Sequence, residues 1–156
     1  MQNVYFETPL GTALLVGDES GIVSFSVLDE KFPTSINIPD YLEKAVSQIG
    51  EYFSGNRKNF DLKLQPNGTD FQKKVWQLLS EIPFGEIISY QQLSKKFGDP
   101  KAIRAIASAN GKNPLWILVP CHRVIGSNGS LVGYGGGIWR KKYLLELENP
   151  NQQKLF

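Results

Sequence analysis

The pattern of hydrophobic and polar positions differs between the two parts of the chain. Near the amino terminus, three β-rich runs separated by Pro- and Gly-containing turns cover residues 4–8, 12–16 and 22–28. Runs of this length with turn residues between them predict an antiparallel meander. A period of 3.6 residues then predicts a helix over 39–54, which Gly55 ends. Its predicted inward stripe consists of Leu42, Ala45, Val46, Ile49 and Phe53.

Capping boxes begin two helices in the second part of the chain. Thr69 and Gln72 form the first box, and Ser89 and Gln92 form the second. In both, the three-residue spacing lets each residue cap the backbone N–H of the other. The first helix is expected to end before the turn at 83–85, and the second to be short. The inward positions are expected to be Phe71, Val75, Leu78, Leu79 and Ile82 on the first and Tyr90, Leu93 and Phe97 on the second.

The segment 98–100 predicts a tight turn into another helix, over roughly 101–110. Asp99 is a good N-cap, and Pro100 suits the first helical position. Two short helices joined this way form a helix-turn-helix pattern, which ordinary core helix pairs also show. The second helix carries small residues and one long basic side chain after its first residue, Arg104. Major-groove readers need several Arg, Asn or Gln side chains, so the pattern favours minor-groove contact and base extrusion. The alternative is a small-residue helix packed into the core.

The remaining segments complete the predicted fold. An apolar run over 113–119 predicts a buried strand, which Pro120 ends. A turn is expected at 126–129, a glycine-rich loop that lets a ligand approach the backbone at 133–137, and a last helix over 138–148. The sequence therefore predicts an α+β fold of two domains. A structural domain over 1–64 has a small antiparallel β-sheet and a helix, and a mainly helical domain over 69–156 has the helix-turn-helix. The linker between them is expected to contain a short strand.

Composition excludes several classes of protein. The chain has 156 residues, 41% of them hydrophobic, with one cysteine and one histidine. A single cysteine excludes an internal disulfide, and one Cys with one His supplies no tetrahedral zinc set. The amino terminus shows no signal peptide, and no apolar run reaches membrane-spanning length. We therefore expect no metal, no cofactor and no membrane contact, and a location in the cytoplasm with access to the nucleoid.

Charge is distributed unevenly along the chain. Residues 1–68 carry nine Asp and Glu against five Lys and Arg, a balance of −4, whereas residues 69–156 carry six against twelve, a balance of +6. A chance distribution would also produce such a difference in segments this short. The functional interpretation is a basic carboxy-terminal module that binds a polyanion.

The two most reactive side chains are adjacent in the sequence, at Cys121 and His122, and each is the sole residue of its type. Cysteine is the softest nucleophile among side chains, and histidine is suited to proton transfer near neutral pH. Successive side chains on a strand point to opposite faces, so the two can cooperate only if the backbone turns here or a water joins them. The alternative is a small buried thiol beside a surface histidine.

One acidic residue is placed unusually. Glu148 lies on the inward stripe of Leu144 and Leu145 at the end of the last predicted helix, where a carboxylate opposes the helix macrodipole. A histidine partner would explain this position, because a carboxylate fixes the tautomer of an imidazole and raises its basicity. The alternative is an exposed glutamate near the end of the chain.

The segment Pro120-Cys121-His122-Arg123-Val124 resembles the active-site signature of the O6-alkylguanine-DNA alkyltransferases, or methylated-DNA–protein-cysteine methyltransferases. The resemblance covers about residues 69–148 specifically. The other matching segments, in family order and spacing, are 71–76, Pro83-Phe84-Gly85-Glu86, Ser89-Tyr90, Pro100-Lys101-Ala102, Arg104-Ala105, 110–114, Gly133-Tyr134 and 144–148.

The resemblance implies a DNA-repair protein that reacts once. It would flip O6-alkylguanine, chiefly O6-methylguanine, out of duplex DNA and transfer the alkyl group irreversibly to its own cysteine. Such a protein is a single-turnover methyltransferase without a cofactor, and its amino-terminal domain would be RNase H-like. The expected partner is double-stranded DNA that contains O6-alkylguanine, and the protein is expected to act as a monomer.

The resemblance also implies residue roles. The catalytic set would be Cys121 as nucleophile, His122 as its base through a water, Glu148 orienting His122, and Tyr90 donating a proton toward N3 of the guanine. The DNA-binding set would be Arg104, which fills the gap left by the flipped base, with Ala102, Ala105, Ser108 and Arg123. The substrate-binding set would be Asn113, Val124, Tyr134 and Gly135. In that set Asn113 ties the active-site turn to the DNA-binding helices, the carbonyls of Cys121 and Val124 accept from the guanine amino group, and the Gly135 N–H reaches O6.

Two departures from the family pattern concern the size of the substrate. Gly135 and Gly136 stand where the family often carries Ser, Arg or a bulky aromatic residue, and Trp116 stands where a smaller residue is usual. A loop with so few side chains predicts an emptier pocket that admits bulky substituents such as benzyl.

Three other functions compete with alkyl transfer. A non-catalytic lesion-binding relative would carry tryptophan in place of the cysteine. A helix-turn-helix regulator would bind one DNA sequence, with Cys121 dispensable. A cysteine hydrolase would use Cys121, His122 and Glu148 to turn over an ester or amide.

Overall fold

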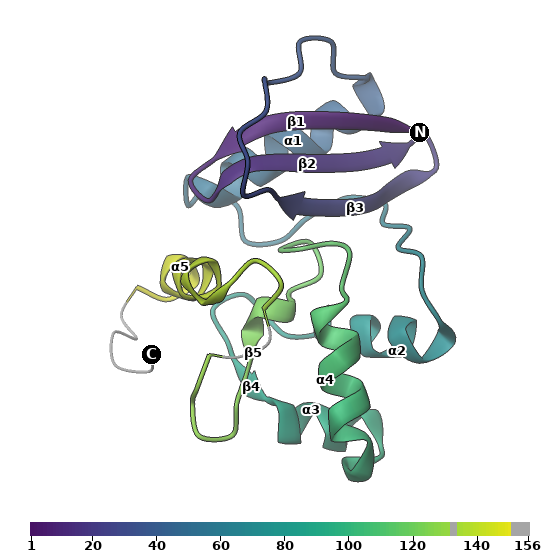
Figure 1. Ribbon diagram of the computed structural model, residues 1–156, viewed down its shortest axis with the longest axis vertical. Coiled ribbons are helices and arrows are strands. Elements are labelled where there is room, and N and C mark those ends of the chain that lie inside the picture. Colours follow the sequence, from purple (N-terminus) through teal and green to yellow (C-terminus); the bar gives the residue numbers. More distant parts are fainter. Residues whose placement is uncertain (132–133, 151–156) are drawn as a thin grey trace. The chain divides into compact units, whose positions relative to one another are not determined.

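Figure 1 shows the computed structural model, which describes residues 1–131 and 134–150. The chain divides into two compact units, residues 1–67 and the residues from 68 onward. The first unit consists of β1 (Gln2–Thr8), β2 (Gly11–Asp18), β3 (Gly21–Val27) and α1 (Asp40–Phe53). The second consists of α2 (Asp70–Leu79), β4 (Ile88–Ser89), α3 (Tyr90–Phe97), the 3-10 turn η1 (Pro100–Ala102), α4 (Ile103–Gly111), the 3-10 turn η2 (Cys121–Arg123), β5 (Val124–Ile125) and α5 (Ile138–Glu148).

The first unit is a three-stranded sheet packed against one helix. The strand order is β1-β2-β3 with antiparallel pairing throughout, so the predicted meander is confirmed. Helix α1 packs on β1 and β2 (Figure 1). Its stripe differs from the prediction at the end of the helix, where Tyr52 is buried and Phe53 is half-buried.

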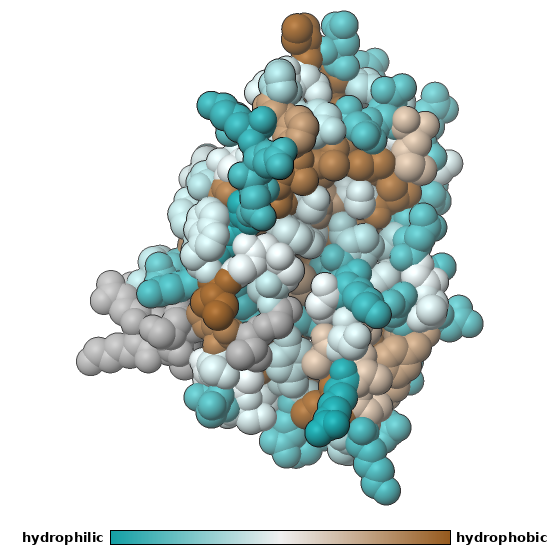
Figure 2. Space-filling view, viewed as in Figure 1, coloured by the Kyte–Doolittle hydropathy of each residue, from teal (hydrophilic) through white to brown (hydrophobic). Residues whose placement is uncertain are grey.

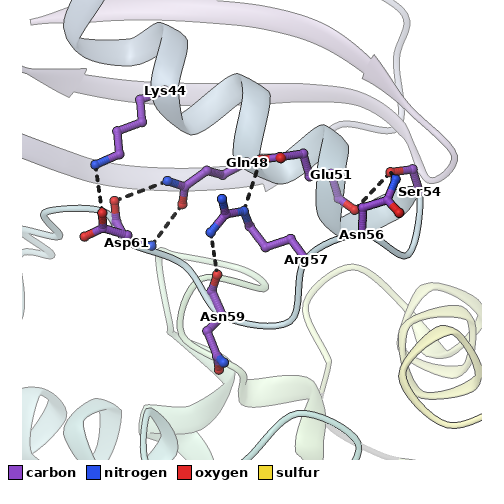
Figure 3. Close-up of polar contacts among 8 residues, drawn as sticks. All are labelled: Lys44, Gln48, Glu51, Ser54, Asn56, Arg57, Asn59 and Asp61. Atoms are coloured by element: carbon purple, nitrogen blue, oxygen red, sulfur yellow. Dashed lines mark hydrogen bonds and ion pairs between the residues drawn. The ribbon is translucent and has the colours of Figure 1, made fainter.

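Polar contacts of α1 hold the segment that follows it (Figure 3). Gln48, which is buried, donates through Nε2 to the Asp61 carbonyl at 3.4 Å and accepts from the Asp61 backbone N–H at 2.9 Å. Lys44 pairs with the Asp61 carboxylate at 3.1 Å, and Arg57 pairs with Glu51 at 3.1 Å. The short strand predicted in this segment is reduced to a single parallel bridge, between Leu64 and Ile22.

Both predicted capping boxes begin helices of the second unit. The Thr69 hydroxyl accepts from the Gln72 backbone N–H at 3.1 Å, and the Gln72 side chain accepts from the Thr69 N–H at 3.0 Å. Ser89 and Gln92 make the same reciprocal pair at the start of α3, at 3.0 and 2.8 Å. Gly98 ends α3 in the left-handed conformation, with φ of 98°, which glycine adopts without strain. These local hydrogen bonds set the spacing of α3 and α4.

The predicted buried strand at 113–119 is wrong, because the segment folds as a series of turns. Leu118 N–H donates to the Trp116 carbonyl at 2.7 Å, Val119 N–H donates to the Leu115 carbonyl at 2.9 Å, and Ile117 has φ of 70°. The side chain of Asn113 bonds the backbone of Leu115 and Val119, and so takes the place that a neighbouring strand would have. Apolar residues are buried here as predicted, but in a compact turn.

Hydrophilic side chains cover most of the surface drawn in Figure 2, with apolar patches between them. Within residues 1–131 and 134–150, no helix has the length and apolar character needed to cross a membrane.

Candidate active site

The reactive cysteine and histidine lie in a single turn of 3-10 helix, η2. The turn begins where the Cys121 N–H donates to the Val119 carbonyl at 2.8 Å, and the Arg123 N–H donates to the Pro120 carbonyl at 3.1 Å. Strand β5 follows and pairs in parallel with β4, which anchors the turn to the start of α3. The backbone therefore turns at this point, which is one of the two alternatives that would let Cys121 and His122 cooperate. Both side chains are buried.

A carboxylate from α5 contacts the histidine. The Nε2 of His122 lies 2.6 Å from Oε2 of Glu148, and both side chains are almost completely buried. An ionised carboxylate only accepts hydrogen bonds, so Nε2 carries the proton and Nδ1 keeps its lone pair. That Nδ1 is buried and has no partner among the residues that the structure describes. The histidine thus presents an unpaired base inside the protein.

Arg123 is buried in the protein. Its predicted role as a DNA contact is therefore corrected. Only 6% of the residue is exposed. Its Nε donates to Glu148 Oε1 at 2.8 Å and one terminal nitrogen donates to Oε2 at 3.0 Å, a bidentate pair. The other terminal nitrogen donates to the Ile82 carbonyl at 2.7 Å. Three of the five N–H donors of this guanidinium therefore bond within the protein, and little of the residue is exposed to a phosphate.

The turn after α2 also fastens the end of α5. Gly85 has φ of 83°, its N–H lies 3.4 Å from Oε1 of Glu148, and its carbonyl accepts from the Asn149 side chain at 3.1 Å. Glu148 therefore accepts hydrogen bonds from Gly85 in this turn and from His122 and Arg123 in η2. These donors compensate for the unfavourable position of a carboxylate at a helix C-terminus.

The charge states of this group follow from burial and pairing. Burial raises the pKa of Glu148, but the contacts with His122 and Arg123 outweigh burial and hold the pKa well below its usual range. Arg123 contributes to this at any pH near neutrality, because a guanidinium stays charged. Burial lowers the pKa of His122, and Glu148 opposes that shift. At neutral pH the histidine is therefore neutral and the carboxylate is ionised.

The thiol is protonated at neutral pH. Burial raises the pKa of Cys121 to about 11, although the Asn113 amide and the charge of Lys141 partly offset the effect. Lys141 is itself buried, its Nζ donates to the Val124 carbonyl, and burial lowers its pKa to about 8. Because the thiolate is the nucleophile, this site needs a base at the moment of reaction. Lys141 supplies the nearby positive charge and was missed at the sequence level, where a Lys in a helix has no distinguishing signal.

Tyr90 lies beside the same turn. Its hydroxyl oxygen is 3.0 Å from Nδ2 of Asn110, at the end of α4. Burial raises the pKa of Tyr90, the hydrogen bond from Asn110 lowers it, and the neighbouring Cys121 raises it. The phenol is therefore protonated and near the sulfur, as a proton donor must be.

Two of the predicted substrate-binding residues form hydrogen bonds within the protein. Asn113 is buried and uses both ends of its amide on the backbone of Leu115 and Val119, so it shapes the turn before Cys121 and contacts no open space. The predicted tie to the active-site turn is present. Val124 is buried, and its carbonyl accepts from Lys141, which leaves that oxygen one further lone pair.

The expected emptier pocket beside the glycine-rich loop is also wrong, because the rings of Trp116 and of the loop's own Tyr134 fill the space beside Gly136. The rings of Trp116 and Tyr134 lie 5.4 Å apart between centroids. A Cβ atom at Gly136 would lie 2.9 Å from each ring and 3.1 Å from Cδ of Arg140, and one at Gly135 would lie 3.4 Å from Trp116. Trp116 thus takes the volume that side chains of the loop would occupy. Gly133 lies outside the described residues.

Helix α4 presents an open face. Arg104, Ala105 and Ser108 are exposed, and Ala102, just before the helix, is half-buried, whereas Ile106, Ala109 and Asn110 form the inward face. Small side chains on the exposed side let the helix backbone approach a groove closely. The alternative of a helix packed on all sides is therefore wrong.

Three buried side-chain polar atoms have no hydrogen-bond partner among residues 1–131 and 134–150: Asn110 Oδ1, His122 Nδ1 and the Tyr134 hydroxyl. All three lie around Cys121. Asn110 Nδ2 is 3.5 Å from its carbonyl, His122 follows it in the chain, and Cys121 influences the pKa of Tyr134. Buried polar groups are rarely left unpaired, so a cluster of them indicates a place where a polar ligand binds. The same residues contain no group of three or more His, Cys, Asp or Glu side chains that could hold a metal.

The fold and the site together define a class of protein, one with a helix-turn-helix and a single buried thiol beside a histidine–carboxylate pair. The family described as 6-O-methylguanine DNA methyltransferase matches in two parts, with its ribonuclease-like domain over residues 1–66 and its DNA binding domain over residues 70–150. The chain belongs to this family. The predicted family and fold class are confirmed, and so are the predicted function and enzyme class at the level of DNA repair by a methylated-DNA–protein-cysteine methyltransferase.

Curated relatives and solved structures match over nearly the whole chain. The methylated-DNA–protein-cysteine methyltransferase of Methanosarcina acetivorans is 46% identical over 155 residues, covering 95% of this chain and 98% of the relative. The enzyme of the same description from Mycobacterium bovis is 44% identical over 146 residues, with 91% and 88% covered. The crystal structure of Mycobacterium tuberculosis OGT in complex with DNA has a TM-score of 0.88 at 43% identity and covers 96% of this chain and 94% of its own.

Proposed function

We propose that the protein removes the alkyl group from O6-alkylguanine in duplex DNA and keeps it on Cys121, with the other site residues in the roles given below. The observation that supports this best is the cluster of unpaired buried polar atoms around a buried, protonated thiol. A thiol with a pKa of about 11 is inert until a base acts on it, which suits a nucleophile that must react once and only with the right substrate.

The proposed reaction is a displacement at the alkyl carbon. His122 takes the Cys121 proton through a water that bonds its unpaired Nδ1, while Glu148 holds Nε2–H. The S–C bond forms as the C–O6 bond breaks, and the electron pair of that bond stays on the guanine. Tyr90 gives a proton to N3, so the guanine leaves neutral. The proton count balances, because His122 gains the thiol proton and Tyr90 loses one, and both reset by exchange with solvent.

Positioning residues complete the proposal. Arg123 keeps Glu148 ionised, and the positive charge of Lys141 lies close enough to lower the pKa of Cys121. On the loop, the Gly135 N–H would bind O6 and Tyr134 would line the site. Since the product is a thioether, which no group in the described residues can cleave, each molecule reacts once.

DNA handling is assigned to the open face of α4. Ala102, Ala105 and Ser108 would lie against the minor groove, and Arg104 would fill the gap left by the flipped base. The related mycobacterial structure in complex with DNA supports DNA as the partner. We further propose that residues 1–64 form a supporting domain while 69–156 carry DNA binding and chemistry, and that the protein acts as a monomer in the cytoplasm.

The experiment that tests this function is a mass measurement. After mixing with excess duplex DNA that contains O6-methylguanine, the intact protein is expected to gain one methyl group, located on Cys121 by peptide mapping, and then to stop. Duplex DNA with unmodified guanine is the control and should leave the mass unchanged. Product formation beyond one equivalent would refute the single-turnover reaction and favour a hydrolase.

A second prediction separates DNA handling from chemistry. Arg104→Ala is expected to slow the repair of duplex substrate at least about tenfold more than reaction with free O6-benzylguanine, because only the duplex requires a base to be held out of the stack, at a few kcal/mol. Single-turnover rates on the two substrates measure this. Lys101→Ala, at the exposed first turn of the same segment, is the matched control for loss of charge alone. Equal losses on both substrates would make Arg104 a structural residue of α4.

A further inference from the structure

Asn110 has no role in the reaction as proposed, yet it lies at the centre of the site. Only 1% of the residue is exposed, at the end of α4. Its amide nitrogen contacts the Tyr90 hydroxyl at 3.0 Å and approaches the Cys121 carbonyl at 3.5 Å. A carbonyl can only accept, so the nitrogen is the end of the amide on that side. The amide oxygen then has no partner among the described residues, although it is buried.

An unpaired buried acceptor is unfavourable unless a ligand satisfies it. A buried group that is left unpaired has lost its bonds to water, and a donor on a bound molecule would restore one of them. The base that this site receives has few donors. In O6-alkylguanine within DNA, N1 carries no hydrogen and N9 is bonded to the sugar, so the 2-amino group is the single hydrogen-bond donor of the ring.

The acceptors that the resemblance suggested for that amino group are only partly available. The Val124 carbonyl already accepts from Lys141 and the Cys121 carbonyl from the Val124 N–H, so each oxygen has lost one of its two lone pairs. The Asn110 amide lies beside the Cys121 carbonyl. A flipped guanine whose N3 faces Tyr90 places its 2-amino group, on the adjacent carbon, toward these two oxygens.

We infer that Asn110 is a specificity-determining residue that accepts a hydrogen bond from the 2-amino group of the flipped guanine. This inference rests on the proposed function. Tyr90 and the Cys121 carbonyl hold the nitrogen of the amide, which aims the oxygen at the base. The residue therefore distinguishes O6-alkylguanine from an O6-alkylated purine without the amino group, because a site whose polar atom is left unpaired rejects the analogue.

The test crosses one protein substitution with one substrate substitution. Single-turnover rates are measured for wild type and Asn110→Leu on duplexes that contain O6-methylguanine or O6-methylhypoxanthine, which lacks the 2-amino group. Asn110→Leu is expected to slow the guanine substrate about fivefold more than the hypoxanthine substrate. Any effect through Tyr90 slows both substrates equally and cancels in the ratio.

Controls make each outcome decisive. Ile106→Val, buried on the same helix, is expected to leave the ratio of the two rates unchanged. Asn110→Met, a second apolar substitution, repeats the measurement if the leucine variant does not fold. Equal slowing of both substrates would overturn the inference while leaving the proposed function intact. Failure of wild type to become methylated on Cys121 would instead refute the proposed function.

Discussion

Cys121→Ser is expected to bind DNA that contains O6-methylguanine and to take up no methyl group, with transfer reduced at least about 10⁴-fold. A hydroxyl is far less ionised than a thiol, and the thiol itself is already raised to a pKa of about 11 by burial. A base that is just able to deprotonate the thiol cannot deprotonate the serine hydroxyl. The sulfur lies among Tyr90, Lys141 and His122, and serine is slightly smaller than cysteine, so the fold around η2 should persist.

Intact mass and DNA affinity check this prediction together. Mass should stay unchanged after long incubation with methylated duplex, while the dissociation constant for the same duplex stays within about threefold of wild type. Methyl uptake by Cys121→Ser would place the acceptor on another residue. Loss of binding together with transfer would mean that the thiol matters for the structure of the site, and Cys121→Ala then separates size from chemistry.

Arg123→Met is expected to lower the free energy of unfolding by about 3–5 kcal/mol and the transfer rate about 100-fold. The substitution removes both donors of the bidentate pair with Glu148 and the bond to the Ile82 carbonyl, and so takes away the permanent positive charge that compensates the buried carboxylate. That carboxylate then favours its neutral form, and His122 loses the anion that fixes its tautomer. Denaturant unfolding and single-turnover rates measure the two effects.

The double variant Arg123→Met/Glu148→Gln is the matched control. With both members of the buried ion pair removed, it should recover much of the lost stability but not the rate, because glutamine cannot support a charged imidazolium. If Arg123→Met alone costs less than 1 kcal/mol, the pair is not the buried ion pair described here. A full recovery of rate in the double variant would remove Glu148 from the proton relay.

The pH dependence of stability also tests the buried Glu148 site, and the direction of the expected change follows from the pKa shifts. The pKa of Glu148 is lower in the folded protein than the unfolded value of about 4.3, so its contribution is present above that pH and is lost as the pH falls below it. The lowered pKa of His122 acts in the same direction below about 6.5. The free energy of unfolding of wild type should therefore fall as the pH is lowered from 7 to 4, and denaturant unfolding at several pH values measures this fall.

Local sequence patterns predicted the elements whose hydrogen bonds close within a few residues. The capping boxes of Thr69 and Ser89 each use a residue three positions away, and the predicted helices begin there. The meander follows from turn residues between strands that are neighbours in the chain. The adjacent cysteine and histidine indicated the type of reaction, because no other side chains of this chain could serve as a soft nucleophile and a neutral base.

Prediction from the sequence was wrong where it depended on a contact or a backbone hydrogen bond that residue type alone does not show. Arg123 in a basic module looks like a DNA contact, but its partners are 25 residues away at Glu148 and 41 residues away at Ile82. Packing of α5 and α2 against η2 brings them together. The run at 113–119 looks like a strand because its residues are apolar. It becomes a turn because one side chain, Asn113, satisfies the backbone.

The sequence by itself thus determined the family, the two capped helices and the identity of the nucleophile, since these depend on residue type and short spacing. Tertiary structure alone decided which groups surround the thiol. It placed Trp116 in the volume beside Gly136, aimed the Asn110 amide at Tyr90, and buried Arg123 against Glu148. The physical reason is that pKa, orientation and free volume depend on what packs around a side chain, and that packing joins segments 20 or more residues apart.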